Sequence, residues 1–327
     1  MDERDRVIIP VIKIGLLSIG TDNELSAIAI GITGPKRGLH VEYCCQLHCG
    51  DYQLALTVHQ PEAALGNDGQ RWPAVVICHG FVGTRIGVNR LFVQAARCFE
   101  QAGYAVVRFD YAGCGESTGR YGDTGLTSMV DQTRAVLEYT SSLPFVDADR
   151  ITLLGHSLGG AVAMLTAVQE PAIRQVILWA AVAHPYAEIC AITGPDVVRR
   201  AYEQGGANYL GYTLKPGFFD SLKRHCPVDA AAQFTGNALI VHGAADAEVP
   251  VRNASLYYQQ LERHGACCQL EILQNADHTF STPGSARAVR TLTRSWLQSR
   301  RSAEFDWKIV SLENGGCGWK DAPPRIF

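Results

Sequence analysis

The chain has 327 residues, of which 47% are hydrophobic and 19% charged; this is enough apolar material for a sizeable core and excludes a disordered or fibrous protein. The formal net charge is -3 and basic residues adjoin one another only in pairs, which argues against nucleic acid or a membrane surface as a partner. The 11 cysteines are odd in number and spread along the chain, so we expect free thiols and a cytoplasmic protein.

The N-terminal region contains an apolar stretch, Val7–Gly20, that raises the question of a membrane segment. Pro10 and Lys13 interrupt it, and it is shorter than the roughly 20 residues needed to span a bilayer. We therefore interpret residues 1–40 as an N-terminal extension without a signal peptide or membrane anchor.

Two groups of residues have the composition of a ligand site but not its spacing. Cysteines and histidines between residues 40 and 49 match no standard zinc pattern, and the alternating faces of a strand would point them apart. The glycines between residues 113 and 119 lack the spacing and the following helix of a dinucleotide-binding loop. We expect neither a metal nor a nucleotide cofactor, and we assign Arg108 and Asp110 a structural role in this loop.

From residue 41 onward, short apolar runs alternate with helical patterns. Two strands joined at Gly50-Asp51 predict a hairpin. Six further runs are nearly continuous and often β-branched, as in strands covered on both faces, and lie at 74–79, 105–111, 151–155, 175–180, 238–243 and 270–273. This alternation predicts an α/β fold with a mostly parallel central sheet, helices on both faces and ligands at the carboxyl ends of the strands.

One connection is too long for a single crossover helix. Residues 183–236 separate two of these strands and are rich in tyrosine and phenylalanine, so we expect a small lid insertion there. Residues 301–327 contain Gly, Pro and charged residues without clear periodicity, which predicts a C-terminal tail. The main domain is then residues 41–300.

Ser157 lies in a G-x-S-x-G sequence between an apolar run and an alanine-rich helical pattern. A serine at a sharp turn from strand to helix adopts a strained backbone, and Gly155 and Gly159 remove the Cβ atoms that would collide there. The helix that starts at Leu158 points its free amide groups at the serine hydroxyl. This context predicts that Ser157 is a nucleophile.

A serine hydroxyl needs a base, and the base needs an orienting acid. His278 follows the last predicted strand and Asp246 follows the strand before it, so both are expected at carboxyl ends. Glu248 and Asp277 are alternative acids, and we rank them second and third because Asp277 adjoins the histidine on one loop. The chain order of Ser157, Asp246 and His278 supports a catalytic triad.

An oxyanion hole requires a second amide besides that of Leu158. The loop after the run at 74–79 continues as His79-Gly80-Phe81, and Gly80 lets it bend back over the edge of the sheet. We expect the Phe81 amide to face the oxyanion. A histidine and a glycine after a strand can also simply cap a turn.

The blocks that carry these residues resemble the α/β-hydrolase superfamily over roughly residues 42–300. They occur in the order of that superfamily as "HGFVG", "RFDYAGCGES", "GHSLGG", "HGAADAEVP" and "NADHTF". Among its branches the chain is most similar to the bacterial cinnamoyl and feruloyl esterases, which have His-Gly-Phe at the oxyanion loop and a small lid before the acid strand. The resemblance implies the same roles for the triad and for the two amides.

The resemblance further implies a serine carboxylic-ester hydrolase that works through an acyl-enzyme, without a cofactor, on short-chain or aromatic, hydroxycinnamoyl-type esters. The partner is then a small-molecule ester, and the lid helps to hold its acyl group. We expect substrate contacts from His156, Tyr186, Tyr209 and Tyr212. The sequence leaves the oligomeric state open, with a homodimer as one option.

Three other functions stay open. Nothing at the serine separates esters from amides or thioesters, so an acyl-peptide or amide hydrolase or a thioesterase could use the same triad. A non-catalytic ligand receptor on a hydrolase scaffold is a third alternative, but such receptors usually have a damaged triad and here all three members are present.

Overall fold

The structure of the chain is a computed structural model that describes residues 27–28, 32–33, 40–64 and 69–313. The apolar stretch at residues 7–20 lies outside the described residues. The strands are β1 (Ala27–Ile28), β2 (Ile32–Thr33), β3 (His40–Cys49), β4 (Tyr52–Gln60), β5 (Trp72–Cys78), β6 (Ala105–Phe109), β7 (Val146–His156), β8 (Gln175–Trp179), β9 (Ala207–Tyr209), β10 (Tyr212–Leu214), β11 (Asn237–Gly243) and β12 (Cys267–Leu273). The helices are α1 (Leu91–Gln101), α2 (Leu126–Ser142), α3 (Leu158–Gln169), α4 (Pro185–Thr193), α5 (Pro195–Gln204), α6 (Pro216–Lys223), α7 (Pro227–Ala230), α8 (Arg252–Arg263) and α9 (Pro283–Glu313).

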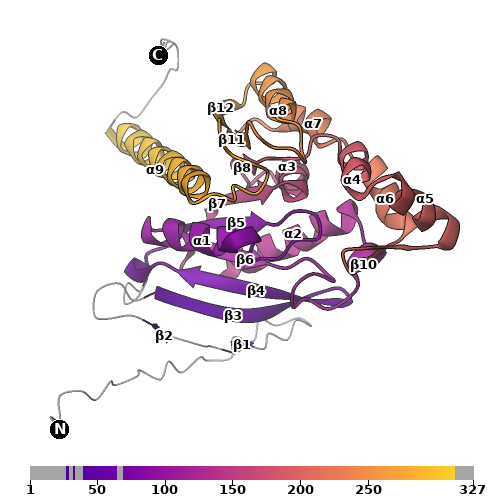
Figure 1. Cartoon of the computed structure of the whole chain (residues 1–327). Coiled ribbons are helices and arrows are strands. Elements are labelled where there is room, and N and C mark those ends of the chain that lie inside the picture. Colours follow the sequence, from indigo (N-terminus) through magenta and orange to yellow (C-terminus); the bar gives the residue numbers. More distant parts are fainter. Residues whose placement is uncertain (1–26, 29–31, 34–39, 65–68, 314–327) are drawn as a thin grey trace, which may run out of the picture.

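The main sheet has the strand order β1-β3-β4-β6-β5-β7-β8-β11-β12, with β2 also paired to β3 (Figure 1). β3 and β4 form the predicted antiparallel hairpin, and β4 joins the rest of the sheet antiparallel to β6. The other strands of this order are parallel to one another, namely β6, β5, β7, β8, β11 and β12. The predicted mostly parallel α/β sheet is therefore confirmed, and its parallel strands all end at one edge.

Side chains along the parallel strands alternate between two covered faces. Along β5, Val75 and Ile77 pack in the cluster formed with α1 and α9, whereas Val76 and Cys78 pack in the cluster formed with α2, α3 and α8. All four side chains are at most 1% exposed. Burial on both faces is why these strands have continuous apolar sequences rather than alternating ones.

The insertion between β8 and β11 contains α4 to α7 and the hairpin β9-β10, and it lies to the right of the sheet in Figure 1. It spans the region expected to form a lid, residues 183–236. Its hairpin is tied to the segment before α2, because the Lys215 amide donates to the Gly122 carbonyl (3.3 Å) and the Lys215 ammonium pairs with Asp123 (2.8 Å). These contacts hold the lid over the carboxyl ends of the strands.

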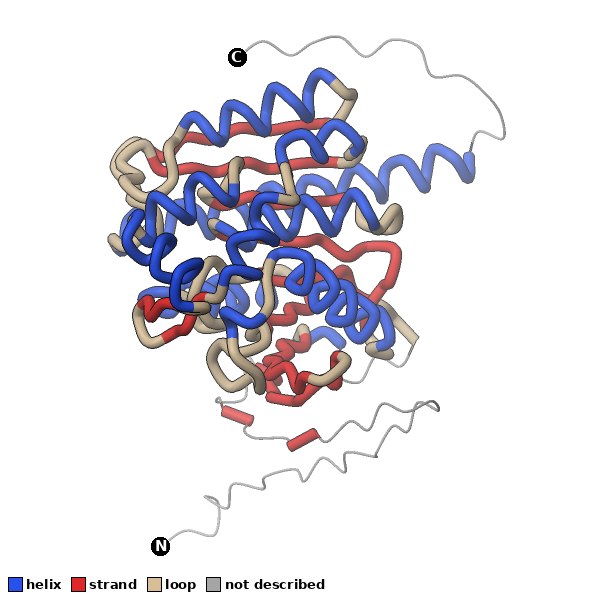
Figure 2. Tube along the Cα trace, turned by 90° about the vertical axis from the view of Figure 1, so that its right-hand side faces the viewer, coloured by secondary structure: helices blue, strands red, loops and turns tan. Residues whose placement is uncertain are grey.

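The C-terminal part of the chain differs from the expectation. Helix α9 continues past residue 301 to Glu313, and its end projects toward the C-terminus in Figure 2. The glycines that suggested a tail begin only at Gly315, and the residues before them include the strong helix formers Ala, Glu, Lys and Leu. Among the residues that the structure describes, no helix combines the length and the apolarity needed to cross a membrane.

The loop after β5 is anchored from below by a buried ion pair. Arg85 donates its backbone amide (2.6 Å) and its guanidinium to the carboxylate of Asp110, which follows β6. The same carboxylate accepts the amide of Glu116 (3.0 Å), whose side chain also binds Arg85. The structural role expected for Asp110 is therefore confirmed, and the residue connects two loops at the carboxyl edge of the sheet.

Replacing Asp110 by alanine tests this anchor. We expect Asp110→Ala to lower the free energy of unfolding by about 3–5 kcal/mol, because it leaves the buried Arg85 without its main partner. Urea unfolding measures the change. The control is Asp196→Ala, which removes an exposed partner of Arg199 and should leave the urea midpoint close to that of the parent protein. Equal midpoints for the two variants would contradict the anchoring role.

Candidate active site

Ser157 occupies a sharp turn between β7 and α3. Its φ of 58° and ψ of -125° lie in a region that residues with a side chain rarely adopt. The turn is also crowded: a Cβ on Gly155 would lie 2.1 Å from the carbonyl oxygen of Gly159, and a Cβ on Gly159 would lie 2.2 Å from that of Cys78. The Ser157 amide donates to the carbonyl of Trp179 at the end of β8 (2.9 Å), which holds the turn against the sheet.

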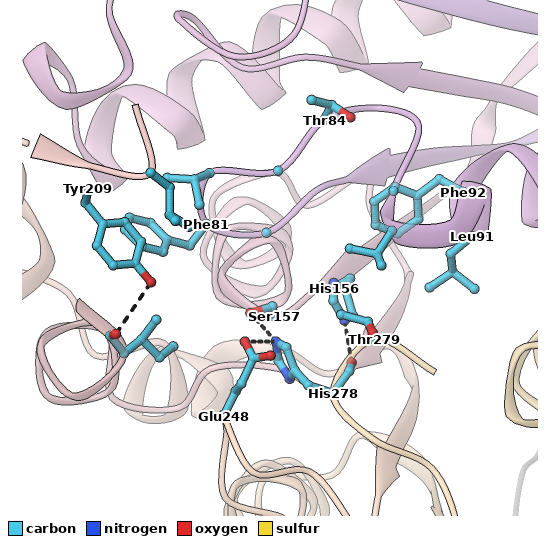
Figure 3. Close-up of a pocket in the computed structure, with 17 residues that line it drawn as sticks. Phe81, Thr84, Leu91, Phe92, His156, Ser157, Tyr209, Glu248, His278 and Thr279 are labelled. Atoms are coloured by element: carbon cyan, nitrogen blue, oxygen red, sulfur yellow. Dashed lines mark hydrogen bonds and ion pairs between the residues drawn. The ribbon is translucent and has the colours of Figure 1, made fainter. Parts of the chain in front are cut away.

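Ser157, His278 and Asp246 form one hydrogen-bonded line across the ends of three strands. The serine Oγ lies 2.9 Å from Nε2 of His278, as Figure 3 shows, and Nδ1 of His278 lies 2.8 Å from Oδ2 of Asp246. Because an ionised carboxylate only accepts, Nδ1 carries the proton and Nε2 is free to accept from the serine hydroxyl. The structure thus brings together the three residues that the sequence analysis singled out.

The two alternative acids have other positions. The Asp277 carboxylate accepts the amide (2.7 Å) and the hydroxyl of Ser281, so it caps its own turn. Glu248 lies 4.0 Å from His278, but on the side of Nε2, which faces Ser157 rather than Asp246. Neither carboxylate reaches Nδ1, and this geometry supports the ranking of Asp246 above both.

The Asp246 carboxylate is saturated with donors. One oxygen accepts the amides of Glu248 (2.9 Å) and Val249 (2.8 Å), and the other accepts from His278 and from Nε2 of His242 (3.1 Å). Burial alone would raise the pKa of Asp246, but the hydrogen bonds from His242 and His278 outweigh it and hold that pKa well below its usual range. The carboxylate is therefore ionised throughout the neutral range.

Leu158 and Phe81, the two residues expected to supply oxyanion-hole amides, both adjoin the site of Ser157. Leu158 is the first residue of α3, so its amide has no acceptor within the helix and points out of the N-terminus. Gly80 packs against Ser157 so closely that a Cβ on Gly80 would lie 2.9 Å from the serine Cβ. This contact brings the next residue, Phe81, to the edge of the pocket that contains Ser157 (Figure 3).

A buried histidine fixes the loop that carries Phe81. The amide of Tyr111 donates to Nε2 of His79 (3.1 Å), so Nδ1 must carry the proton, and it donates to the carbonyl of Gly80 (2.8 Å). Burial lowers the pKa of His79, which keeps the ring neutral and preserves this tautomer. The histidine thus sets the orientation of the peptide group just before Phe81.

A pocket of about 430 Å³ opens at Ser157. Figure 3 shows two arms on either side of the serine: Phe81 and Tyr209 line one, and Leu91 and Phe92 line the other. In the first arm the rings of Phe81 and Tyr209 stack, with centroids 5.5 Å apart and planes inclined by 30°. Because Tyr209 belongs to the lid and Phe81 to the loop after β5, this arm is assembled from two separate segments.

Two of the four expected substrate contacts line the pocket and two do not. Tyr209 and His156 are lining residues. Tyr186 and Tyr212 are not lining residues: the Lys223 ammonium lies 4.7 Å from the Tyr186 ring, and Tyr212 packs edge-on against Tyr121, a buried residue of the segment before α2. Tyr212 pairs with Tyr209 across the tight turn, so the two side chains share one face of the hairpin; Tyr209 reaches the pocket because its ring stacks on Phe81, whereas the ring of Tyr212 turns toward Tyr121.

His156 lines the pocket and packs against His278. Its Nε2 donates to the backbone carbonyl of His278 (2.8 Å), and the two ring centroids lie 4.9 Å apart. Burial, reinforced by the nearby His278, lowers the pKa of His156 to about 3, so it stays neutral. It therefore supports the His278 main chain without adding charge to the pocket.

Comparison with known proteins places this arrangement in a family. The sequence profile described as the prolyl oligopeptidase family matches residues 91–301, more than half of the chain. The chain belongs to the prolyl oligopeptidase family. Est1E from Butyrivibrio proteoclasticus, solved with ferulic acid bound, superposes with a TM-score of 0.67 at 23% identity, covering 79% of this chain and 99% of Est1E. The resemblance to the α/β-hydrolase fold is thereby confirmed.

Curated relatives of this chain are more similar to it in sequence than Est1E is, but the similarity covers only part of each chain. An uncharacterised 31.7 kDa protein of Escherichia coli is 32% identical over 124 residues, which are 38% of this chain and 41% of the relative. The quorum-quenching protein AidA of Acinetobacter baumannii is 34% identical over 133 residues, 40% of this chain and 41% of AidA. The matched part of the chain thus spans about two fifths of the length of these relatives.

His242 is not among the residues predicted from the sequence, and the sequence indicates no specific role for His79. Each is fully buried, and each has a hydrogen bond that only the packed structure reveals. His242 also donates from Nε2 to the Val249 carbonyl (3.1 Å), so the proton is fixed on the nitrogen that faces Asp246. The available signal was a histidine inside an otherwise apolar strand, four residues before the acid.

His242→Phe tests the second imidazole on the acid. We expect a loss of about 1–3 kcal/mol in unfolding free energy at pH 7, because Asp246 and Val249 each lose a donor. The depressed pKa of Asp246 stabilises the folded state above its unfolded value of about 3.9, and this stabilisation is lost as the pH falls through the folded pKa. The variant raises that folded pKa, so the difference in unfolding free energy between the parent protein and the variant should be full where the pH lies above both folded pKa values, and it should shrink as the pH falls through them.

Urea unfolding of both proteins at pH 7, at pH 3 and at lower pH while they remain folded measures the difference in unfolding free energy, which is the gap between parent protein and variant. His264→Phe, at an exposed histidine next to the end of α8, is the control and should show no gap at any of these pH values. A difference that stays constant down to the lowest pH at which both proteins remain folded would show that only the Val249 contact matters.

Proposed function

We propose that the protein is a serine carboxylic-ester hydrolase that works through an acyl-enzyme, with Ser157 as nucleophile, His278 as base and Asp246 as orienting acid. The observation that carries the proposal is the continuous hydrogen-bonded line from the serine Oγ to the buried carboxylate, opening into a pocket of about 430 Å³. That volume falls in the range of roughly 300–1,000 Å³ typical of small-molecule sites.

In the first half-reaction, Ser157 attacks the ester carbonyl carbon while Nε2 of His278 accepts the hydroxyl proton. The carbonyl oxygen becomes an oxyanion, which the amides of Phe81 and Leu158 stabilise. The C–O bond to the alcohol then breaks, and the alcohol leaves with the proton from His278. Asp246 holds the imidazole orientation and stabilises the imidazolium that forms.

In the second half-reaction, water replaces the alcohol. His278 takes a proton from the water, the resulting hydroxide attacks the acyl carbonyl, and the bond to Ser157 breaks as the serine oxygen recovers its proton from His278. The carboxylic acid leaves as the second product. The same two amides stabilise the second oxyanion, so no further group is required.

The pocket favours short-chain or aromatic acyl groups. Its first arm is lined by the stacked rings of Phe81 and Tyr209, which present flat apolar surface beside Ser157. Est1E, solved with ferulic acid bound, shares the fold, and this supports esters of aromatic acids, such as hydroxycinnamoyl esters, as the substrate class. The likeness to Est1E is one of fold, so the aromatic arm is the main support.

An acyl-peptide or amide hydrolase is the second candidate, because the family of this chain is named for oligopeptidases. The same nucleophile and base can cleave an amide, provided that His278 protonates the leaving amine. The two candidate functions are distinguished by kcat/KM for the same acyl group supplied either as a nitrophenyl ester or as a nitroanilide. A higher kcat/KM on the nitroanilide would reverse our preference.

Ser157→Ala tests the proposed nucleophile. We expect kcat for nitrophenyl acetate to fall by about a thousandfold or more, because loss of a triad member removes the covalent route. Steady-state kinetics on the folded variant measure the change, with circular dichroism as the check on folding. Ser255→Ala, at an exposed position on α8, is the control and should keep parental activity. Near-parental turnover in Ser157→Ala would falsify the proposal.

A fluorophosphonate probe tests the same residue without a substrate. The parent protein should be labelled at Ser157 and the Ser157→Ala variant should not, because labelling requires an activated hydroxyl. An unlabelled parent protein would favour the non-catalytic receptor instead.

Tyr209→Ala tests the aromatic arm. We expect the kcat/KM ratio of methyl ferulate to nitrophenyl acetate to fall by about two- to tenfold, because the aryl group loses a ring contact worth about 0.5–1.5 kcal/mol. Tyr212→Ala is the matched control, since Tyr212 lies opposite Tyr209 in the same hairpin but outside the pocket. An equal fall in both variants would mean that the hairpin acts only through the stability of the lid.

A further inference from the structure

The pocket has an unbalanced charge. Among its described lining residues, Glu248 is the one carboxylate, and neither lysine nor arginine lines it. Arg85, on the loop behind the pocket, has its charge matched by Asp110 and Glu116. A substrate that enters this pocket therefore meets a negative charge without a compensating cation.

Glu248 is held beside the reacting atoms. Its amide donates to Asp246, so the turn that positions the acid also positions Glu248. Its Oε2 lies 4.0 Å from Nε2 of His278, and its side chain is 56% exposed. Figure 3 shows the Glu248 carboxylate beside His278 and close to Ser157, and both Glu248 and Ser157 line the pocket.

The carboxylate also lies within electrostatic reach of the aromatic arm. Burial raises the pKa of Tyr209, and the charge of Glu248 raises it further. The π-faces of Phe81 and Tyr209 attract cations, so carboxylate and rings favour the same sign of charge in a ligand. The arm therefore combines two independent features that disfavour an anion.

The expected effect is moderate. Two like charges about 6 Å apart in a half-exposed site change binding by on the order of tenfold at low salt, and salt screens the effect. The triad itself does not account for Glu248, because the carboxylate faces Nε2 and Asp246 already saturates Nδ1.

We propose that Glu248 is a charge-selecting residue, and that the pocket accepts neutral or cationic esters and rejects esters with a carboxylate or phosphate near the scissile bond. This inference rests on the proposed function at Ser157. It predicts that methyl ferulate is a better substrate than chlorogenate, whose alcohol part carries a carboxylate.

The experiment uses three nitrophenyl esters of similar chain length that differ in the charge at the end of the acyl chain, and the comparison between parent protein and variants removes the effect of the differing size of the end groups. They are the neutral pentanoate, the anionic monoester of glutarate and the cationic 4-(trimethylammonio)butanoate, whose quaternary nitrogen cannot attack its own ester. For the parent protein we expect kcat/KM to be about tenfold lower for the anion than for the neutral ester, and the difference to shrink at 1 M salt.

Glu248→Gln should raise the anion-to-neutral ratio of kcat/KM by about tenfold and lower the cation-to-neutral ratio, and Glu248→Lys should reverse the parental order. Glu203→Gln is the control, because Glu203 lies on α5 of the lid and its side chain is also 56% exposed. That control should keep the parental ratios.

Two results separate the inference from the proposed function. If Glu248→Gln changes kcat/KM for all three esters by the same factor, Glu248 acts on His278 rather than on substrate charge, and the inference is overturned. If instead Ser157→Ala hydrolyses the neutral ester normally, the proposed function fails. Loss of activity in Ser157→Ala together with charge-dependent ratios in the Glu248 variants supports both.

Discussion

The strained backbone of Ser157 is the constraint on which the site depends. Its turn places the hydroxyl above the sheet, starts α3 at Leu158 and leaves the Leu158 amide free to face the same point. A conformation this unfavourable persists only where its surroundings enforce it. Here the enforcement comes from the Trp179 carbonyl, which accepts the Ser157 amide, and from the amide of Val182, which donates to the Ser157 carbonyl (3.1 Å). The central parallel strands therefore hold the Ser157 side chain in one position.

Four histidines lie around Ser157, and the hydrogen bonds of each imidazole define which ring nitrogen carries the proton. His278 connects the nucleophile to the acid, His242 donates to the acid from the other side, His79 orients the Gly80 peptide, and His156 donates to the His278 carbonyl. Burial keeps the pKa of His79 and of His156 low, so both stay neutral. The carboxylates next to His278 are then Asp246, buried behind the imidazole, and Glu248, which lines the pocket.

Much of this site could be predicted from the sequence because its elements are local. The glycines around Ser157, and the positions of Asp246 and His278 directly after strands, are readable without tertiary contacts, since parallel strands end at one edge. His242 could not be found in this way, because its function is a hydrogen bond formed only when the strand end and the following turn pack together. The lid tyrosines were also ambiguous, since composition does not show which of two paired tyrosines packs at the pocket and which packs on a neighbouring segment.

The sequence by itself determined the fold class, the order of the strands that carry Ser157, Asp246 and His278, and the proposal that these three residues act together. Periodicity and turn chemistry encode these features within a few residues of each position. Only the tertiary structure decided which aromatic residues meet, that Tyr209 rather than Tyr212 stacks on Phe81, and that Glu248 faces the nucleophile. These contacts join the lid, the loop after β5 and the turn after β11, and their geometry depends on packing between segments far apart in the chain.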